Sequence, residues 1–282
     1  MIRSLLVILL ATVIAMTSAW TDQTDQDAGN NWEGRTDHLK DFQVIEFRRY
    51  VIKEGARAQF ASYFESYFPE AFQQMGAFIF GQLLNRRNPA EFIWIRGFHN
   101  MDDRAKLNQD FYSGPLWKEH SSKMNARLID HTNVLLLKPL NPERGIVVLP
   151  AVDPVREEKG AQGVVVAQIF AVKRGDVDTF AQKAEETFAG YRAAGAREAG
   201  VLVTLDAPNN FPGLPFRTDG PYLVWLGIFK DNLMLEKSFN PLAERASAAL
   251  SSTNQLRGAP ELIVLDPSSR SRLRWLPEAQ IR

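Results

Sequence analysis

The sequence predicts an α+β protein made of two tandem β-α-β-β-α-β units, and two observations support this. Two strand-like runs, residues 44–52 and 164–172, each lead into a Lys-x-Gly motif, and every position of the second run lies 120 residues after its counterpart in the first. Each run is followed by a helix-like pattern and later by a strand with a central tryptophan, Trp94 in one case and Trp225 in the other. The same order of elements, with the first strand and its Lys-x-Gly motif 120 residues apart in the two units, indicates an internal repeat.

In the first unit, strand-like patterns occupy residues 44–52, 78–84, 92–98 and 133–138. A first helix is expected where aromatic side chains recur at helical spacing, namely at Phe60, Phe64, Tyr67, Phe68 and Phe72. Gly76 then serves as a C-terminal cap. A second helical region is expected from Pro115, because proline is favoured at the first helical position, where its missing N–H is not needed.

The second unit follows the same order. Its strand-like patterns are residues 164–172, 198–205, 223–229 and 261–265. Its first helix carries an apolar stripe at Val177, Phe180, Ala184, Phe188 and Tyr191, and ends at Gly195. Pro241 begins the second helical region, as Pro115 does in the first unit.

We therefore predict that each unit forms a ferredoxin-like four-stranded antiparallel sheet with both helices on one face. The units are residues 42–140 and 164–266. The opposite face is partly apolar and must be covered. Two such units in one chain can cover each other, which gives an intramolecular dimeric α/β barrel. Residues 141–163 form the linker, and residues 267–282 form a tail in which Trp275 and Leu276 could dock.

The N-terminus has the pattern of a secretory signal peptide. Arg3 precedes a mostly apolar run at residues 5–15, and a small-x-small site ends at Ala19. A membrane anchor is the alternative, but the run is shorter than the roughly 20 residues that span a bilayer. We therefore expect cleavage after Ala19, a flexible polar leader at residues 20–41, and an exported protein, periplasmic or extracellular, with no stable membrane span after cleavage.

Composition excludes some partners and bonds. The chain has no cysteine, so it forms no disulfide. Its formal net charge is zero and it has no basic block, which argues against a nucleic-acid partner. Its four histidines show no metal-ligand spacing.

Residues 42–140 resemble a NIPSNAP domain. The resemblance rests on EFRRY at 46–50, KxG at 53–55, FIWIRGF at 92–98, FYSGPLWKEH at 111–120, Asn125 and NVLLL at 133–137. The second unit resembles the family only in outline. The resemblance implies the dimeric α/β-barrel fold but no settled enzymatic activity. The best-known members act largely as binding or adaptor proteins associated with mitochondria and vesicle traffic, a setting from which an exported chain departs.

Comparison of the two units points to a site in the first. On the first strand, Glu46, Arg48 and Tyr50 correspond to Val166, Gln168 and Phe170 in the second unit. No arginine of the second unit corresponds to Arg96. When Pro115 is aligned with Pro241, Trp117 and His120 correspond to Ala243 and Ala246. Polar side chains on an apolar surface cost on the order of 1–3 kcal/mol each unless they are satisfied. The first unit carries this cost where the second does not.

Each candidate residue has both a functional and a purely structural interpretation. Arg48 and Arg96 could clamp an anion or carboxylate, or could form an ion pair with Glu46. Tyr50, Trp94 and Trp117 could wall an aromatic or lipid-like pocket, or could be core. His120, the one candidate catalytic residue, could be a general base or haem ligand, or a hydrogen-bonded core histidine. His99 and His131, at strand ends, are expected in solvent.

The connection at residues 206–221 contains four prolines and is much longer than its counterpart at residues 86–89. It is expected to form a lid or partner surface with Phe211 and Phe216 as contact residues, or to be a tolerated insertion.

The sequence leaves open whether the protein is an enzyme. One expectation is an exported protein that binds a small aromatic or lipid-like molecule or a protein partner. The alternative, by analogy of fold, is a monooxygenase-like enzyme, either cofactor-independent or haem-dependent. Haem is thus one candidate cofactor, and association into homo-oligomers is a further option.

Overall fold

The computed structural model describes residues 42–276, so the expected signal peptide and leader, and the tail residues 277–282, lie outside it. Eight strands close one antiparallel barrel in the order β1-β3-β2-β8-β5-β7-β6-β4. They are β1 (Val44–Ile52), β2 (Phe78–Asn85), β3 (Glu91–Phe98), β4 (Leu128–Pro139), β5 (Val164–Ala171), β6 (Arg197–Thr204), β7 (Tyr222–Phe229) and β8 (Glu261–Pro267). The structure confirms a mixed α/β protein with a closed barrel.

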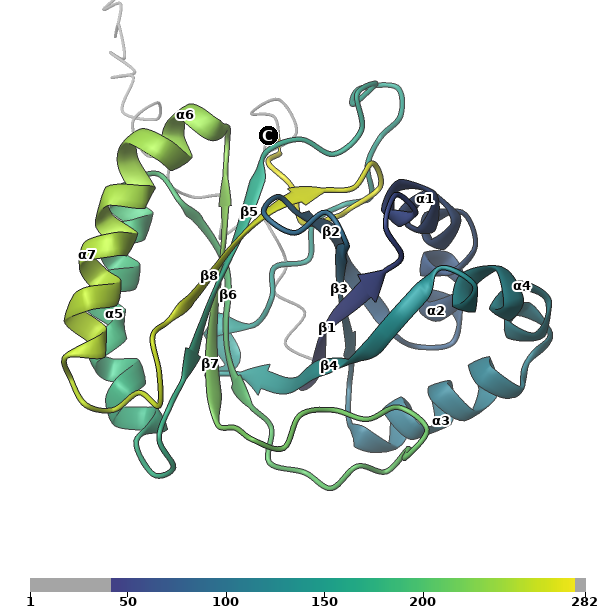
Figure 1. Ribbon diagram of the computed structural model, residues 1–282, viewed down its shortest axis with the longest axis horizontal. Helices are drawn as coiled ribbons and strands as arrows, with labels where there is room; N and C mark the ends of the chain where they lie inside the picture. The colour runs from purple at the N-terminus through teal and green to yellow at the C-terminus, as the bar shows by residue number, and fades with distance from the viewer. Residues whose placement is uncertain (1–41, 277–282) are drawn as a thin grey trace, which may run out of the picture.

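The helices form two layers, one on each side of the barrel (Figure 1). One layer holds α1 (Arg57–Tyr67), α2 (Pro69–Gln74), α3 (Met101–Ser113) and α4 (Pro115–Asn125). The other holds α5 (Val177–Ala193), the short α6 (Asn232–Met234) and α7 (Asn240–Ser251), with a π-helical turn at Leu235–Phe239. Within residues 42–276, no helix has the length and apolar character needed to cross a bilayer.

The strand order groups the barrel into two halves, β4-β1-β3-β2 and β8-β5-β7-β6. Short pairings join them: β2 with β8, from Leu83 opposite Pro267, and β4 with β6, from Leu137 opposite Thr204. The registers within the halves match at the central tryptophans. Trp94 pairs with Arg48, and Trp225 pairs with Gln168. The two halves can therefore be compared position by position.

Side chains of a strand alternate between the barrel interior and the helical layer. On β1, Ile45 and Phe47 belong to the barrel core, whereas Tyr50 belongs to the core under the helices. The linker and tail help to fill the barrel, because Leu149 and Leu273 are fully buried in the same interior core. Leu276 is buried there as well, so part of the tail is packed rather than free.

Several element boundaries differ from those predicted. Strand β4 begins at Leu128, five residues before the predicted start at residue 133. The aromatic stripe of residues 60–72 is divided between α1 and α2, because Pro69 begins a new helix rather than continuing the first. Residues 101–113 form a full helix, α3, before the one that begins at Pro115. Its N-terminus is capped by Asn100, whose side chain accepts a hydrogen bond from the Asp103 amide.

Candidate functional site

Two rows of polar side chains face each other between the sheet and the helices of the first half. On β1 the row is Glu46, Arg48 and Tyr50, and on α3 it is Arg104, Asn108 and Tyr112. Four steps along a strand cover about 13 Å and eight along a helix about 12 Å, so the rows have the same length. Arg96 on β3 contacts both rows.

Glu46 lies at the centre of three arginines. Its carboxylate accepts from Arg48 Nη1 at 2.7 Å, from Arg96 Nε at 2.6 Å and from Arg104 Nε at 2.6 Å. All four side chains are fully buried. Arg48 and Arg96 thus form ion pairs with Glu46, as one of the two sequence interpretations predicts. Because one carboxylate is shared by three guanidinium groups, positive charge is in excess.

The close approach of these charged groups shifts the pKa values of Glu46 and Arg96. Burial by itself raises the pKa of Glu46, but the attraction of Arg96, Arg48 and Arg104 outweighs it, so the pKa lies well below its ordinary value of 4.5. Burial lowers the pKa of Arg96 more than Glu46 raises it, and Arg48 lowers it further. Arginine nevertheless stays charged at neutral pH. The cluster (Glu46, Arg48, Arg96 and Arg104) is therefore cationic.

Several donors around this charge cluster have no acceptor. Among residues 42–276, the buried side-chain nitrogens without a hydrogen-bond partner are Arg48 Nη2, Arg96 Nη1, Asn108 Nδ2 and Trp94 Nε1. An unsatisfied buried donor costs about 1–3 kcal/mol, and more when it is charged. All four belong to the two rows or to β3 beside them, so the missing partner is an acceptor.

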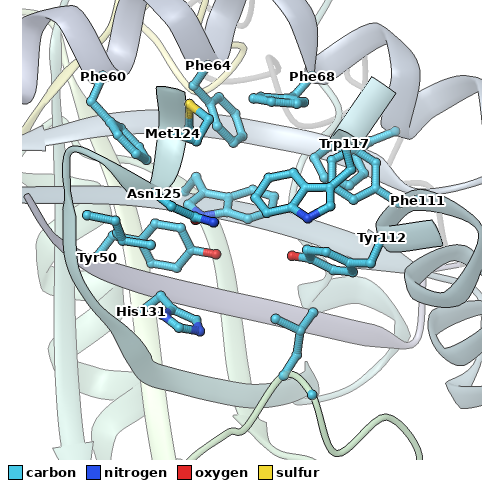
Figure 2. A pocket seen from close by; sticks show the side chains of 15 residues that line it. Tyr50, Phe60, Phe64, Phe68, Phe111, Tyr112, Trp117, Met124, Asn125 and His131 are labelled. Atoms are coloured by element: carbon cyan, nitrogen blue, oxygen red, sulfur yellow. The ribbon is translucent and has the colours of Figure 1, made fainter. Parts of the chain in front are cut away.

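Next to the donors lies a cavity of about 210 Å³. Its walls are mostly aromatic: Tyr50, Phe60, Phe64, Phe68, Phe72, Trp94, Phe111, Tyr112 and Trp117, with Met124, Asn125, Leu128, His131, Gly213 and Leu214. Figure 2 shows the hydroxyls of Tyr50 and Tyr112 pointing toward one another across it. Because Arg48 Nε donates to the Tyr50 hydroxyl at 3.1 Å, the charge cluster meets the cavity at Tyr50.

Two titratable side chains of the wall keep their neutral forms at neutral pH. Burial, reinforced by Tyr50, raises the pKa of Tyr112 to about 12, so its hydroxyl remains a donor. Burial and then the charge of Arg48 lower the pKa of His131 from 6.5, which favours the neutral imidazole. The His131 ring meets the Tyr50 ring edge-on at 6.1 Å. The cavity wall thus presents a neutral imidazole at His131 and a neutral phenol hydroxyl at Tyr112.

The long connection between β6 and β7, residues 205–221, crosses from the second half to this site (Figure 1). Arg104 Nη1 donates to the side-chain oxygens of Asn209 and Asn210, at 3.2 and 3.1 Å, and Arg104 Nη2 donates to the Leu214 carbonyl at 3.3 Å. Gly213 and Leu214 line the cavity. We call residues 205–221 the cover loop.

The structure brings most of the sequence candidates together. Tyr50, Trp94 and Trp117 line the cavity, and the guanidinium carbons of Arg48 and Arg96 lie 5.5 and 5.1 Å from the centre of the Trp94 ring. The two predicted loop contacts also lie here. Phe211 stacks on Tyr112 at 6.0 Å, and Phe216 lies under Arg104 at 5.5 Å.

His120 lies apart from this group. Its Nδ1 is hydrogen-bonded to the Tyr63 hydroxyl at 2.6 Å, and its ring packs on Tyr67 at 4.0 Å. The side chain is buried and does not line the cavity. This arrangement is that of a hydrogen-bonded core histidine, and it leaves the apolar stripe around it intact.

Sequence reasoning missed Arg104, Asn108, Tyr112 and His131. The first three recur at i, i+4 and i+8 on α3, next to the apolar Leu107 and Phe111, and that spacing was the available signal. His131, expected in solvent, is partly buried and lines the cavity.

The matching region of the second half is satisfied and filled. The indole Nε1 of Trp225 donates to Glu198 at 3.0 Å, whereas that of Trp94 has no partner. The Tyr191 hydroxyl donates to Gln168, the residue at the position of Arg48, at 3.0 Å. Phe239 stacks on Trp225 at 5.9 Å. The second half therefore serves as an internal control for a site in the first.

The residues present do not fit haem. The candidate ligand His120 is bonded to Tyr63 outside the cavity. The cavity, at about 210 Å³, is smaller than the roughly 300–1,000 Å³ typical of cofactor and drug-sized sites. Within residues 42–276, no group of three or more His, Cys, Asp or Glu side chains could hold a metal ion.

No protein-family model and no curated protein matches the sequence. Solved structures do match. A protein from Lactobacillus acidophilus, provisionally named a monooxygenase, covers 83% of this chain and 98% of its own with a TM-score of 0.52 and 11% identity. A similarly named protein from Fusobacterium nucleatum covers 83% and 96%, with a TM-score of 0.52 and 10% identity. A NIPSNAP family protein from Agrobacterium tumefaciens covers 36% of this chain and 92% of its own, with a TM-score of 0.33 and 22% identity.

At these identities the likeness concerns the fold. The chain shares the dimeric α/β barrel of the first two proteins over most of its length, and NIPSNAP proteins are among the structures that match a part of it. The barrel fold expected from the sequence is confirmed at that level.

Proposed function

We propose that this protein binds a small one-ring aromatic molecule that carries an anionic oxygen. The observation that supports this most is the excess of buried positive charge, with three guanidinium groups around one carboxylate. Removing ions from water costs several kcal/mol each unless opposite charge compensates them. An anionic ligand supplies that charge and an acceptor for the donors of Arg48, Arg96 and Trp94.

The cavity sets the size and character of the rest of the ligand. An apolar cavity of about 150 Å³ accommodates benzene, so about 210 Å³ accommodates one ring with a small polar group. The aromatic walls of Phe64, Phe68 and Phe111 favour a flat apolar body. The polar end lies at Tyr50, where the cavity meets Arg48.

A carboxylate or an acidic phenol matches this polar end. Arginine donates two N–H groups in one plane and binds planar oxyanions with directional hydrogen bonds. Arg48 and Arg96 each keep one unused terminal nitrogen. Tyr112, whose pKa is raised to about 12, adds a neutral hydroxyl donor.

The test is a titration of the purified protein with benzoate and with its neutral counterpart benzamide, followed by tryptophan fluorescence because Trp94 and Trp117 line the cavity. We expect saturable binding of benzoate that is at least about tenfold tighter than that of benzamide, a difference of roughly 1.4 kcal/mol. Arg48→Gln, which installs the residue found at Gln168 in the second half, should abolish the preference. Equal affinity for the two compounds would refute the proposal.

A second candidate function is cofactor-independent oxygenation of a phenol-type ligand, which the position of His131 favours. A neutral imidazole beside Tyr50 can take a phenolic proton, and the Arg48 and Arg96 guanidinium groups can stabilise the phenolate. With hydroquinone the balanced reaction consumes one O₂ and gives 2-hydroxy-1,4-benzoquinone and water. One oxygen atom of O₂ enters the ring, and the other leaves as water with the two hydrogens lost.

Oxygen uptake with hydroquinone tests this second candidate. The product should carry one labelled oxygen from ¹⁸O₂, and His131→Asn should lower the rate by about 10²–10⁴-fold if the imidazole is the general base. Uptake no faster than that of hydroquinone alone would rule out turnover of this substrate class while leaving the binding proposal standing.

We further propose that each half of the barrel is a ferredoxin-like unit and that the two arose by internal repetition. The strand orders β4-β1-β3-β2 and β8-β5-β7-β6, and the matched positions of Trp94 and Trp225, support this. We also propose export through the signal-like residues 1–19, which would place the cavity outside the cytoplasm. Cell fractionation tests the second point: cytoplasmic full-length protein would contradict it.

A further inference from the structure

Leu214 lines the aromatic cavity of the first half although it belongs to the second half. Of the cavity-lining residues, Gly213 and Leu214 come from the cover loop, and the others come from residues 50–131. Leu214 is the one buried residue of the loop, with 4% of its surface exposed, while its neighbours are exposed or partly exposed. A buried apolar side chain of the loop thus forms part of the cavity wall.

The backbone of the loop holds Leu214 in place from both sides. Its amide donates to the Phe211 carbonyl at 3.0 Å, which makes a tight turn through Pro212 and Gly213. Its carbonyl accepts from Arg104 Nη2 at 3.3 Å and from Asn209 Nδ2 at 3.1 Å. The position of the side chain is therefore defined by the turn and by Arg104, and not by a ligand.

The loop is also attached to the first half beside Leu214. Asn210 donates to the Met101 carbonyl at 2.6 Å, and the Arg217 amide donates to the Val134 carbonyl at 2.8 Å. Phe211 stacks on Tyr112 of the cavity wall. The connection at the same point of the first half, between Asn85 and Glu91, is short and makes no such cover. The length of the loop thus has a structural consequence at the cavity.

We propose that Leu214 is a specificity-determining residue that limits the ligand to one ring. The inference rests on the proposed binding of an aromatic acid. The anionic group is held by the first half, and one part of the cavity wall is a side chain of the second half. Removing three side-chain carbon atoms from that wall in Leu214→Ala should enlarge the cavity there and make room for a second ring.

The experiment compares benzoate with 2-naphthoate, an acid with the same head group and two fused rings, on the full mature chain. We expect the wild-type protein to bind benzoate at least about tenfold more tightly than 2-naphthoate, and Leu214→Ala to reduce that ratio at least about tenfold. Leu214→Phe should exclude 2-naphthoate and weaken benzoate. Leu233→Ala is the matched control, because Leu233 is an exposed leucine of the same half.

The outcomes separate the two proposals. If the wild-type protein binds benzoate and Leu214→Ala leaves the ratio of the two affinities unchanged, this inference is wrong and the binding proposal stands. If the wild-type protein binds neither acid, both are wrong. Thermal unfolding checks that each variant is folded; should Leu214→Ala be unfolded, Leu214→Val is expected to change the ratio in the same direction by a smaller factor, and an unchanged ratio there would likewise overturn the inference.

Discussion

The Nε atom of Arg104 on α3 lies 2.6 Å from a carboxylate oxygen of Glu46 on β1, and both side chains are fully buried. The other two nitrogens of the same guanidinium bond to the cover loop, at Asn209, Asn210 and the Leu214 carbonyl. One side chain therefore connects the charge cluster of the first half to the loop that covers the cavity. The candidate site depends on residues of both halves.

Arg104→Gln should loosen the cover loop. The variant removes hydrogen bonds to three loop residues but leaves Glu46 with Arg48 and Arg96, so the fold should remain. We expect amide hydrogen exchange in residues 209–216 to become about tenfold faster while the barrel strands keep their protection. Unchanged exchange in these residues would show that Arg104 does not hold the loop.

Glu46→Gln should destabilise the protein strongly. The substitution leaves three buried guanidinium groups with no carboxylate, and breaking a buried ion pair costs about 3–5 kcal/mol. Chemical unfolding at pH 7 measures the difference. A loss below about 1 kcal/mol would mean that solvent or another group already compensates the arginines.

The stability difference between the wild-type protein and Glu46→Gln should also depend on pH. Because the pKa of Glu46 is depressed in the folded state, its ionisation stabilises the fold above the unfolded value of 4.5, and this contribution is lost as the pH falls below it. The difference in unfolding free energy between wild type and Glu46→Gln should thus be largest near pH 7 and shrink below about pH 4.5. A difference that stays constant down to pH 3 would contradict the assigned shift.

The two central tryptophans should respond differently to the same change. Trp225→Phe leaves Glu198 without the indole donor and should cost about 1–3 kcal/mol. Trp94→Phe removes a donor that has no acceptor, so it should cost less, and it should weaken benzoate binding. Chemical unfolding and the benzoate titration measure both effects. Equal losses of stability would argue that Trp94 Nε1 is satisfied in solution.

Removing the charge of Arg48 should raise the pKa of His131. Burial and Arg48 both disfavour the imidazolium ion, so Arg48→Gln relieves the second effect and moves the pKa upward toward 6.5. An NMR titration of the imidazole resonances measures this. A pKa that falls or does not change would place His131 outside the field of the charge cluster.

His120→Phe should lower stability without changing ligand affinity. The substitution breaks the hydrogen bond to Tyr63, which costs about 0.5–1.5 kcal/mol, but His120 does not line the cavity. Tyr63→Phe is the matched control, because it removes the same hydrogen bond and leaves the histidine. A folded His120→Phe variant that no longer binds benzoate would restore His120 as a member of the site.

The period of two along β1 was enough to set Glu46, Arg48 and Tyr50 on one face of a strand. It could not tell which face, because in a closed barrel covered by helices both faces are buried. The partner of His120 was equally out of reach, since Tyr63 lies far away in sequence. The polar stripe of α3 was readable at Arg104, Asn108 and Tyr112 but was overlooked in favour of the helix at Pro115.

The cover loop shows a further limit of local patterns. Its length and prolines indicate a lid or partner surface, with Phe211 and Phe216 as contact residues, or a tolerated insertion. Which surface it covers depends on how the halves close, through the β2–β8 and β4–β6 pairings. Leu214, the residue that enters the cavity, carries no local signal that distinguishes it from an ordinary loop leucine.

A crystal structure with 4-bromobenzoate tests the central claim most directly, because the anomalous signal of bromine fixes the direction of the ligand. We predict a carboxylate oxygen within about 3.2 Å of Arg48 Nη2 or Arg96 Nη1, and the bromine among the aromatic walls of the cavity. A ligand with its bromine at the arginines, or bound only outside the cavity, would contradict it.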